Sequence, residues 1–300
     1  MKRPYWYLLL LTFASCGTIL AQEAPKWDLE ETDAMYLESG DVDSSGIRRG
    51  LDGSPDIPDQ FFFRNGIDIT VLDQSTLPAC VGYAIAGAVG IRLNWFCRRT
   101  CSCRGKLPPF SALYIFNQIY RGDGKGITLA AGLDTLWAQG ICLNDDFRTD
   151  PHNPNIKPPD TAVQAARKFQ FWNKRERIFF LPTEMSDAAQ RYALMLDLLR
   201  SHLSAGLPVI AGLRCPDDFF QFKGDRYHPV DALPEKANHA VVVTGYDNKT
   251  QEVEILNSHG TDWGDQGFLR ISYADFCKMA RYGYVLRLNG GVGSTCGAKQ

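Results

Sequence analysis

Apolar positions in the first half of the chain recur at helical spacing. From Cys80 onward, hydrophobic side chains follow one another every three or four residues, at Ala84, Ala88, Ile91 and Trp95. This spacing predicts a helix with one apolar face. Residues 98–109 break the pattern, and two further helices are predicted at residues 111–120 and 129–139. The first half is therefore expected to be mainly helical.

The second half begins with one more helix and then changes period. From about residue 187 a leucine-rich face continues until Gly206 and Pro208 end the helix. Short apolar runs separated by turn residues then predict strands at residues 209–213, 240–245, 252–257, 268–271 and 284–288. A helical half followed by a strand-rich half predicts the α+β fold class. A cleft is expected between the two halves.

The two ends of the chain differ from its body. Residues 1–21 combine a basic start, an apolar run too short to span a bilayer and small residues before a cleavage point, which predicts a signal peptide. An alternative interpretation keeps Cys16 as a lipid-modified N-terminus. Residues 22–54 and 290–300 are expected to be flexible, and residues 55–289 to form the folded domain. The protein is expected to be exported, secreted or periplasmic, and no later stretch is expected to span a membrane.

The net charge and the cysteines of the chain bear on its binding partners and on its possible disulfides or metal sites. The chain has 32 basic and 34 acidic residues and a net charge of −2, so no overall field attracts nucleic acid. Residues 167–177 mix basic and aromatic side chains, as nucleic-acid binders do, but a solvated strand edge is the favoured interpretation. Disulfides, free thiols or a zinc site are all possible for Cys97, Cys101, Cys103 and Cys142. Export favours disulfides, and neither a metal nor a cofactor is expected.

Three residues suggest nucleophilic catalysis. Cys80 stands at or near the first turn of the predicted helix, where the helix dipole favours the thiolate, the nucleophilic form of cysteine. His239 begins a predicted strand, and the next strand ends at Asn257, whose amide can hold an imidazole in one tautomer. Taken singly, each residue also has an ordinary structural explanation. Cys80 could form a disulfide or be a buried thiol, His239 could be a core histidine, and Asn257 could cap the following loop.

Three sequence blocks that contain these residues resemble the papain-like cysteine peptidase family, and its bacterial branch in particular. They read Gln-Ser-Thr-Leu-Pro-Ala-Cys at residues 74–80, Asn-His-Ala-Val-Val-Val-Thr-Gly-Tyr at residues 238–246 and Asn-Ser-His-Gly-Thr-Asp-Trp-Gly-Asp-Gln-Gly-Phe at residues 257–268. The blocks occur in the family's order. The resemblance implies a papain-like fold, with a helical part at about residues 70–180, a β-barrel-like part at about residues 181–289 and the active-site cleft between them.

The resemblance also implies a role for each matching residue. Cys80 would be the nucleophile, paired as a thiolate with the His239 imidazolium. Asn257 would orient that imidazole, and Gln74 with the Cys80 backbone N–H would stabilise the oxyanion. Substrate contacts are implied at Gly126, Asn238 and His259. The implied activity is hydrolysis of a peptide or protein substrate through an acyl-enzyme, by a protein expected to be a monomer.

The chain departs from the family's pattern near these residues. Leu77 replaces a cysteine, Val81 replaces an aromatic residue, and His259 replaces a tryptophan whose ring shields the Asn–His hydrogen bond. The separation between Cys80 and His239 exceeds the family's usual ~130–150 residues. It implies insertions around residues 97–109 and 215–234.

Two alternatives to a peptidase stay open. His259 motivates a catalytically impaired papain-fold protein that binds a peptide or a partner. An acyl transferase, or transpeptidase, would use the same acyl-enzyme with an amine as the final acceptor.

Overall fold

The computed structural model of the protein describes residues 57–100, 106–148, 153–182 and 187–289. The predicted signal peptide at residues 1–21, including Cys16, lies outside these ranges. So do the segment 22–54 and the tail 290–300, and so do Cys101 and Cys103.

The described chain has a run of helices in its first half and most of its strands in its second half. The helices are the 3-10 helix η1 Phe63–Asn65, α3 Cys80–Thr100, α4 Ala112–Ile119, α5 Leu129–Gln139, α6 Asp160–Arg167, α7 Ala188–Ser204, α8 Asp217–Phe220 and α9 Tyr273–Met279. The strands are β1 Gln60–Phe62, β2 Glu176–Phe180, β3 Val209–Leu213, β4 Arg226–Tyr227, β5 His239–Asp247, β6 Glu252–Leu256, β7 Phe268–Ser272 and β8 Ala280–Val285.

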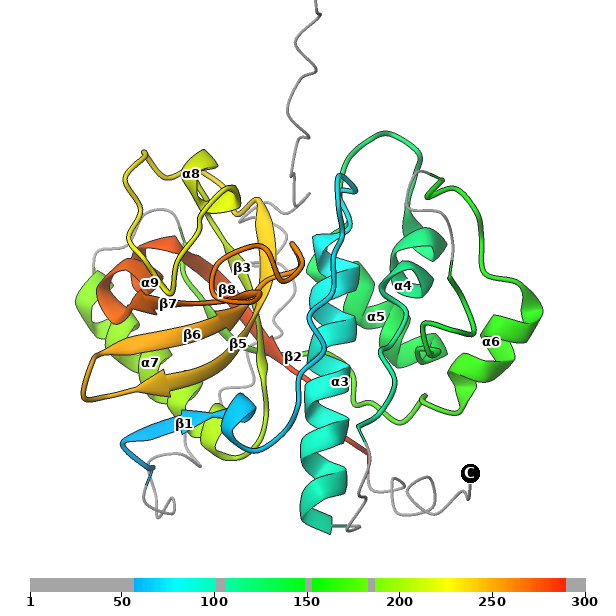
Figure 1. Ribbon diagram of the computed structural model, residues 1–300, viewed down its shortest axis with the longest axis horizontal. Helices are drawn as coiled ribbons and strands as arrows, with labels where there is room; N and C mark the ends of the chain where they lie inside the picture. Colours follow the sequence, from blue (N-terminus) through cyan, green and yellow to red (C-terminus); the bar gives the residue numbers. More distant parts are fainter. Residues whose placement is uncertain (1–56, 101–105, 149–152, 183–186, 290–300) are drawn as a thin grey trace, which may run out of the picture.

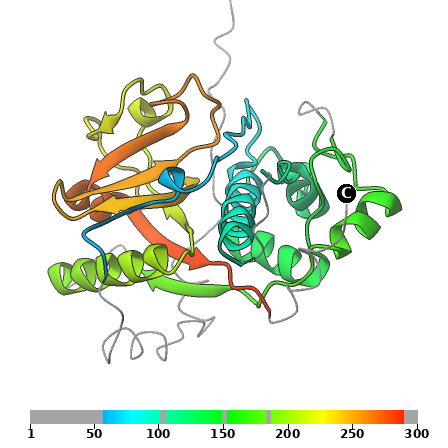
Figure 2. The ribbon, with the colours of Figure 1, turned by 60° about the horizontal axis from the view of Figure 1, so that its bottom comes forward.

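The strands and most of the helices occupy different halves of the molecule (Figure 1). Within the described residues, one eight-stranded sheet has the order β2-β8-β3-β5-β6-β7-β4, with β1 paired to β5 outside this path. Neighbouring strands run antiparallel except for β4 and β7. Helices α3 to α6 form the other half, and α7 lies along the sheet (Figure 2). The predicted α+β class is confirmed.

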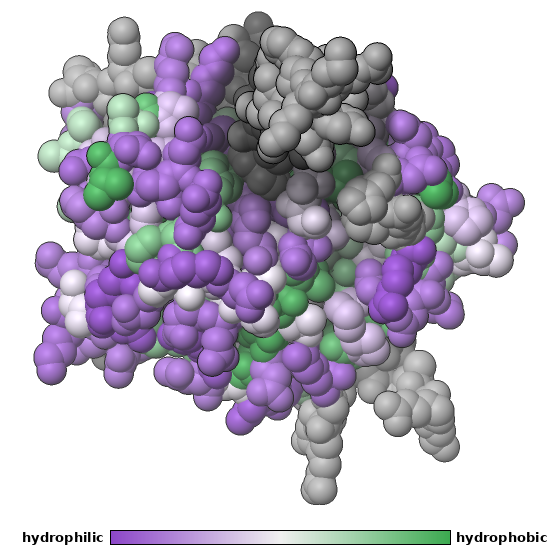
Figure 3. Space-filling view, turned by 45° about the horizontal axis from the view of Figure 1, so that its top comes forward, coloured by the Kyte–Doolittle hydropathy of each residue, from purple (hydrophilic) through white to green (hydrophobic). Residues whose placement is uncertain are grey.

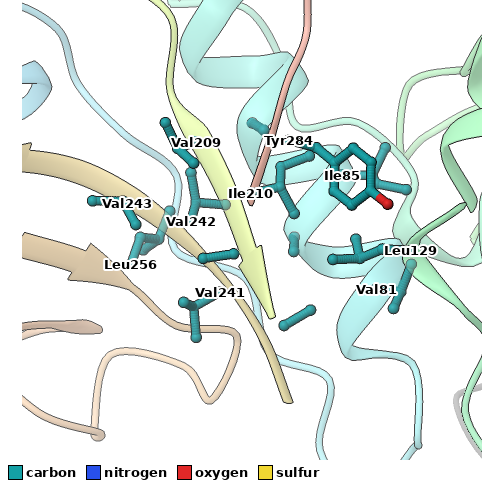
Figure 4. Close-up of a cluster of buried hydrophobic side chains, with 14 of the residues drawn as sticks. Val81, Ile85, Leu129, Val209, Ile210, Val241, Val242, Val243, Leu256 and Tyr284 are labelled. Carbon is teal, nitrogen blue, oxygen red and sulfur yellow. The ribbon is translucent and has the colours of Figure 1, made fainter. Parts of the chain in front are cut away.

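Helix α3 lies at the centre of the core between the two halves. Figure 4 shows Val81 of this helix beside Leu129 of α5, with Ile210 of β3 on the sheet side. A Cβ at Gly132 of α5 would lie 2.8 Å from the side chains of both Val81 and Ile85. Gly82 lets α4 approach closely, since a Cβ at this position would lie 2.5 Å from the carbonyl oxygen of Ala112. The helix continues to Thr100, past the predicted break at residue 98.

Burial of α3 corrects one expectation. Within the described residues, this helix is long and apolar enough to cross a membrane by length and composition, whereas no such stretch was expected beyond the leader. However, 67% of its apolar window is buried inside the fold. A helix packed on several sides is apolar nearly all round, so its position in the core accounts for its composition.

The segment before α3 belongs to the sheet half. Strand β1, which was not predicted, pairs with β5 through Phe61 and Tyr246. The rings of Phe61 and Phe63 each make edge-to-face contacts with Trp95 of α3, at centroid distances of 5.3 and 5.1 Å. Aromatic pairs of this geometry add to the area that they bury. They fix the course of the chain toward residue 74.

Several other elements differ from the predicted ones. Strands β3, β6 and β7 lie where they were expected, but the last strand occupies Ala280–Val285 instead of residues 284–288. Helices α6 and α9 and strand β2 were not predicted. Cys142, Cys215 and Cys277 are buried free thiols, so the disulfide considered for Cys142 is not formed. The mixed basic and aromatic segment 167–177 runs from the last residue of α6 into β2. Its last residue, Arg177, is buried.

Candidate active site

Strands β5 and β6 bring His239 and Asn257 together. His239 is the first residue of β5, and Asn257 directly follows the last residue of β6. Because the two strands are antiparallel neighbours, the start of one lies beside the end of the other. His239 Nε2 and Asn257 Oδ1 are 2.7 Å apart, and both residues are buried.

The tautomer of His239 follows from a second contact of Asn257. The backbone N–H of Ser258 donates to the same Asn257 Oδ1 at 2.8 Å. A backbone N–H is always a donor, so the Asn257 atom that faces it is the oxygen. His239 must then donate from Nε2, and in the neutral ring Nδ1 is the proton acceptor. The imidazole is therefore held in the tautomer that a general base at Nδ1 requires.

Ser258 connects this pair to Gln74. Its hydroxyl donates to Gln74 Oε1 at 2.5 Å, and its carbonyl accepts from the Gln74 backbone N–H at 2.8 Å. Gln74 Nε2 in turn donates to the carbonyl of Leu77 at 2.7 Å. Gln74 is fully buried. A glutamine amide has two N–H donors, and the second has no acceptor among the described residues.

Cys80 stands at the same end of the interface between the halves. It opens α3, and the first helical bond runs from the Tyr83 N–H to the Ala79 carbonyl. The first N–H groups of a helix have no acceptor within it and carry a partial positive charge. One turn further on, Tyr83 and Ala84 share a small cavity with Asn257 and Ser258.

Cys80 also lies within electrostatic range of Cys215. The pKa of the fully buried Cys215 thiol is raised above its usual range, first by burial and then by the charge of Cys80. The backbone of Cys215 is bonded to the side chain of Asn238, the residue before His239. The structure thus joins His239, Asn257 and Gln74 through hydrogen bonds and places Cys80 within electrostatic range of Cys215, which is bonded to the residue before His239.

Burial controls the charge of His239. The pKa of this imidazole is lowered to about 3, mainly by burial and then by the nearby His259, while the hydrogen bond to Asn257 raises it. Burial disfavours the charged form of a base. Burial and His259 thus act against the charged imidazolium, and the hydrogen bond to Asn257 acts in its favour.

His259 takes the position beside His239 that the motif assigns to it. The two ring centroids are 5.5 Å apart and the ring planes differ by 37°. Asp73 pairs with His259 in an isolated β-bridge, and its charge raises the pKa of His259 against the larger lowering by burial. His259 is thus an ionisable neighbour of His239 and acts on it through charge.

The other two predicted substrate contacts lie in different surroundings. The Asn238 side chain accepts from the Cys215 N–H at 2.8 Å and donates to the Cys215 carbonyl at 2.7 Å. It thereby fixes the start of β5. Gly126 lines a cavity of about 310 Å³ between the end of α4 and the start of α5, together with Arg121 and Asp123.

Sequence reasoning missed two contributors to this site. Ser258 joins Asn257 to Gln74, and its position directly after Asn257 in the third block was the available signal. Phe220 of α8 is the other, with its ring centroid 5.2 Å from that of His239. It lies in the expected insertion at residues 215–234, and no pattern in the sequence pointed to the active site from there.

Comparisons with known proteins concern the fold and part of the sequence. The sequence profile of papain family cysteine proteases matches residues 168–286. The crystal structure of xylellain, a cysteine protease from Xylella fastidiosa, superposes with a TM-score of 0.63 at 18% identity, covering 88% of this chain and 96% of that one. The chain is similar to papain family cysteine proteases over these residues and in its fold. Its papain-like fold is confirmed, and the bacterial branch stays a prediction.

Relatives in sequence are distant from this papain-like chain. An uncharacterized peptidase C1-like protein of Acanthamoeba polyphaga mimivirus is 22% identical over 210 residues, covering 68% of this chain and 65% of the relative. Cathepsin K of Gallus gallus is 24% identical over 213 residues, covering 70% and 57%. The chain thus spans less than two thirds of either relative.

A further solved structure carries an inhibitor. The cysteine protease CMS1MS2 of Carica candamarcensis, in complex with E-64, superposes with a TM-score of 0.57 at 17% identity, covering 77% of this chain and 99% of that one. At this identity the likeness concerns the fold.

Proposed function

We propose that this papain-like protein is a cysteine-type peptidase that hydrolyses peptide bonds through an acyl-enzyme on Cys80. The observation that carries the proposal is the continuous set of hydrogen bonds from His239 through Asn257 and Ser258 to Gln74. It holds a base in a defined tautomer and an amide donor beside the residue that opens α3.

The proposed reaction runs through a thiolate–imidazolium pair of Cys80 and His239, with the imidazole held by Asn257. The Cys80 thiol transfers its proton to His239 Nδ1 as the sulfur attacks the peptide carbonyl. Asn257 then accepts a hydrogen bond from the imidazolium. The second N–H of Gln74 and the first N–H groups of α3 stabilise the oxyanion.

The acyl-enzyme forms when the carbon–nitrogen bond of the peptide breaks. His239 gives its proton to the leaving amine and returns to its neutral form. It next takes a proton from water, whose oxygen attacks the thioester carbon. Breakage of the carbon–sulfur bond releases the acid, and His239 returns its proton to the sulfur, which restores the Cys80 thiol and the neutral imidazole.

Covalent labelling tests the nucleophile separately from the choice of substrate. The purified protein is treated with E-64, which reacts with activated thiols, and the adduct is located by mass spectrometry. Cys80→Ser removes the proposed nucleophile, and Cys97→Ser in the last turns of the same helix is the matched control. Burial raises the pKa of the Cys142 and Cys277 thiols to about 12, so these two should not react.

The expected result is an adduct at Cys80 in the wild type and in Cys97→Ser, and none in Cys80→Ser. A folded protein that never labels at Cys80 would contradict the proposal. It would instead favour the peptide- or partner-binding alternative, which the low pKa of His239 and the neighbouring His259 support. Product analysis with a peptide substrate and an added amine separates hydrolysis from acyl transfer.

We also propose that the protein is exported, secreted or periplasmic, on the basis of the signal-peptide pattern in residues 1–21. N-terminal analysis of the mature protein tests this. A start at Gln22 supports cleavage of the leader, a lipid-modified Cys16 supports the alternative, and an intact Met1 contradicts both. The protein is further proposed to act as a monomer, which sedimentation analysis checks.

A further inference from the structure

A cavity of about 270 Å³, here called the distal cavity, lies toward the end of α3 that is remote from Cys80. Helix α3 runs from the top to the bottom of the molecule in Figure 1. An α-helix rises 1.5 Å per residue, so Arg92 lies about 18 Å along the axis from Cys80. The lining residues are Arg92, Trp95, Phe96, Arg99 and Thr100 of α3, with Ser204 and Ala205 at the end of α7. The distal cavity is thus separate from the candidate active site.

One face of α3 supplies two cations and two aromatic rings to this cavity. Arg92, Trp95, Phe96 and Arg99 follow the spacing that places side chains on one side of a helix. The guanidinium carbon of Arg92 lies 5.8 Å from the centroid of the Phe96 ring, and that of Arg99 lies 5.7 Å from the centroid of Trp95. A guanidinium over an aromatic face is attracted to it and oriented by it. The two positive charges are therefore presented beside an apolar surface.

Trp95 forms a rigid part of the cavity wall. A Cβ at Gly66 would lie 2.5 Å from the six-membered ring of the indole, and a Cβ at Gly206 would lie 2.4 Å from the indole nitrogen. The backbone thus contacts both ends of the ring system, and Gly206 directly follows the last lining residue of α7. A wall fixed in this way keeps its shape whether or not a ligand is bound, as most ligand pockets do.

The charges of the distal cavity are not balanced by the protein. Within the part of the chain that the structure describes, no carboxylate lines the cavity, and Arg92 Nε is buried without a hydrogen-bond partner. Burial, and then the charge of Arg287, lowers the pKa of Arg92. Arg287 itself is neutralised by Glu176, to which it donates two hydrogen bonds of 2.5 and 2.9 Å. Arg92 is thus left with a positive neighbour and no negative one.

The position of Arg92 is not explained by the end of the helix. Basic side chains are favoured in the last turn of a helix, where free carbonyls carry a partial negative charge, and this accounts for Arg98 and Arg99. Arg92 lies two turns earlier, where carbonyls are bonded within the helix. Partial burial of an unpaired guanidinium disfavours the folded state, so an anion that pairs with it stabilises the fold.

We propose that the distal cavity binds a small organic anion that carries one carboxylate and an aromatic ring. The carboxylate accepts hydrogen bonds from the guanidinium groups of Arg92 and Arg99. The ring of the ligand packs against Trp95 and Phe96. A cavity of about 270 Å³ is just smaller than the ~300–1,000 Å³ of pockets for drug-sized ligands, so the ligand is small. This binding goes beyond the proposed peptidase activity and does not depend on it.

The test must separate the distal cavity from the rest of the polar surface. The top of the molecule, which comes forward in Figure 3, is mainly hydrophilic, and an anion held by charge alone does not need an aromatic contact. Three probes are therefore compared: 2-naphthoate, its neutral amide 2-naphthamide, and inorganic phosphate. Binding is measured by isothermal titration calorimetry with the purified wild-type protein and with Cys80→Ser.

The variants remove one positive charge at a time. Arg92→Gln and Arg99→Gln change the two cations of the cavity, and Arg98→Gln is the matched control. Arg98 lies beside Arg99 in the last turn of α3 and is exposed, but it does not line the cavity. Urea unfolding without any probe is measured for the same proteins. Because Arg92 Nε has no partner, Arg92→Gln should not lower the urea midpoint, whereas a structural role for Arg92 would lower it.

Wild type and Cys80→Ser are expected to bind 2-naphthoate equally. 2-Naphthamide and phosphate should each bind about 10-fold more weakly or worse, since one lacks the charge and the other the ring. Arg92→Gln and Arg99→Gln should each weaken the binding of 2-naphthoate about 10-fold or more, and Arg98→Gln should leave it unchanged. In the wild type, 2-naphthoate should also raise the unfolding temperature, because it binds the folded state only.

The inference is overturned if 2-naphthoate does not bind, if 2-naphthamide or phosphate binds as tightly, or if Arg98→Gln weakens binding as much as Arg99→Gln. If Arg92→Gln does not fold, the comparison of Arg99→Gln with Arg98→Gln still decides the outcome, since both residues are exposed. Binding to Cys80→Ser reports on the distal cavity alone, so its result is independent of the labelling that tests the proposed function.

Discussion

Replacing Asn257 by alanine tests the bond on which the active site depends. The change removes one acceptor shared by two buried donors, the His239 Nε2–H at 2.7 Å and the Ser258 backbone N–H at 2.8 Å. A buried donor left without an acceptor costs ~1–3 kcal/mol. The free energy of unfolding should therefore fall by about 2–6 kcal/mol, measured by urea unfolding at pH 7.

The same change should slow the reaction. The bond from His239 to Asn257 is strongest when the imidazole is charged, and a hydrogen bond to a charged group contributes ~1.5–3 kcal/mol. This corresponds to a loss of ~10- to 10²-fold in kcat/KM. The hydrogen bond raises the pKa of His239, so the alanine variant should also have an even lower pKa at this residue.

Asn257→Asp is the matched control, because it keeps an oxygen acceptor at the same place and adds a negative charge. It should raise the pKa of His239 and retain more stability than Asn257→Ala. Assays with a fluorogenic peptide give kcat/KM for all three proteins across about pH 5–9. About five pH values are enough to compare the three pH profiles of kcat/KM. If Asn257→Ala matches the wild type in both rate and stability, the assigned role of Asn257 is refuted.

Three further outcomes follow from other contacts. Gln74→Ala should lower kcat by about 10²–10³-fold with a smaller change in KM, since the donor acts on the oxyanion; an unchanged kcat would remove Gln74 from the mechanism. Glu254→Gln removes the charge of a buried carboxylate that pairs with the partly exposed Arg64, whose Nε lies 2.7 Å away, and should reduce the free energy of unfolding by ~1–3 kcal/mol, measured in urea. Burial lowers the pKa of both His239 and His202 below 6.5, so the unfolded chain binds protons that the folded chain does not. Their effect on the free energy of unfolding is absent above pH 6.5. As the pH falls from there toward the folded pKa values, each histidine should lower the free energy of unfolding by up to ~1.4 kcal/mol per pH unit. Urea midpoints that do not fall between pH 7 and pH 5 would contradict this.

Local patterns predicted the elements that carry the chemistry. The helix that opens at Cys80 and the strands that flank His239 and Asn257 are each defined by a short-range period, and they occur where expected. The antiparallel order of β5 and β6 then brings His239 and Asn257 together. A site built from the ends of neighbouring elements can thus be predicted from a sequence in which those elements are clear.

Long-range pairing escaped the same reasoning. Strand β1 precedes α3 in sequence but pairs with β5 in the sheet, through residues such as Phe61 and Tyr246. Strand β8 is buried along its whole length between β2 and β3, so its sequence lacks the alternation that would have fixed its bounds. The extent of α3 was underestimated for a similar reason, because a helix in contact on several sides has no single apolar face.

The two departures from the family pattern meet at one place in the fold. The sequence presented the exchange at His259 and the insertion around residues 215–234 as separate features. The structure puts the insertion's α8 over the exchanged residue, and the ring of Phe220 contacts both His259 and His239. A smaller, ionisable side chain beside the catalytic base adds positive charge when it is protonated, and that charge lowers the pKa of His239. An apolar ring at the same place opposes protonation of both histidines by excluding water. Burial and this neighbour therefore act in the same direction on His239, against the charged imidazolium, while the hydrogen bond to Asn257 acts in the opposite direction.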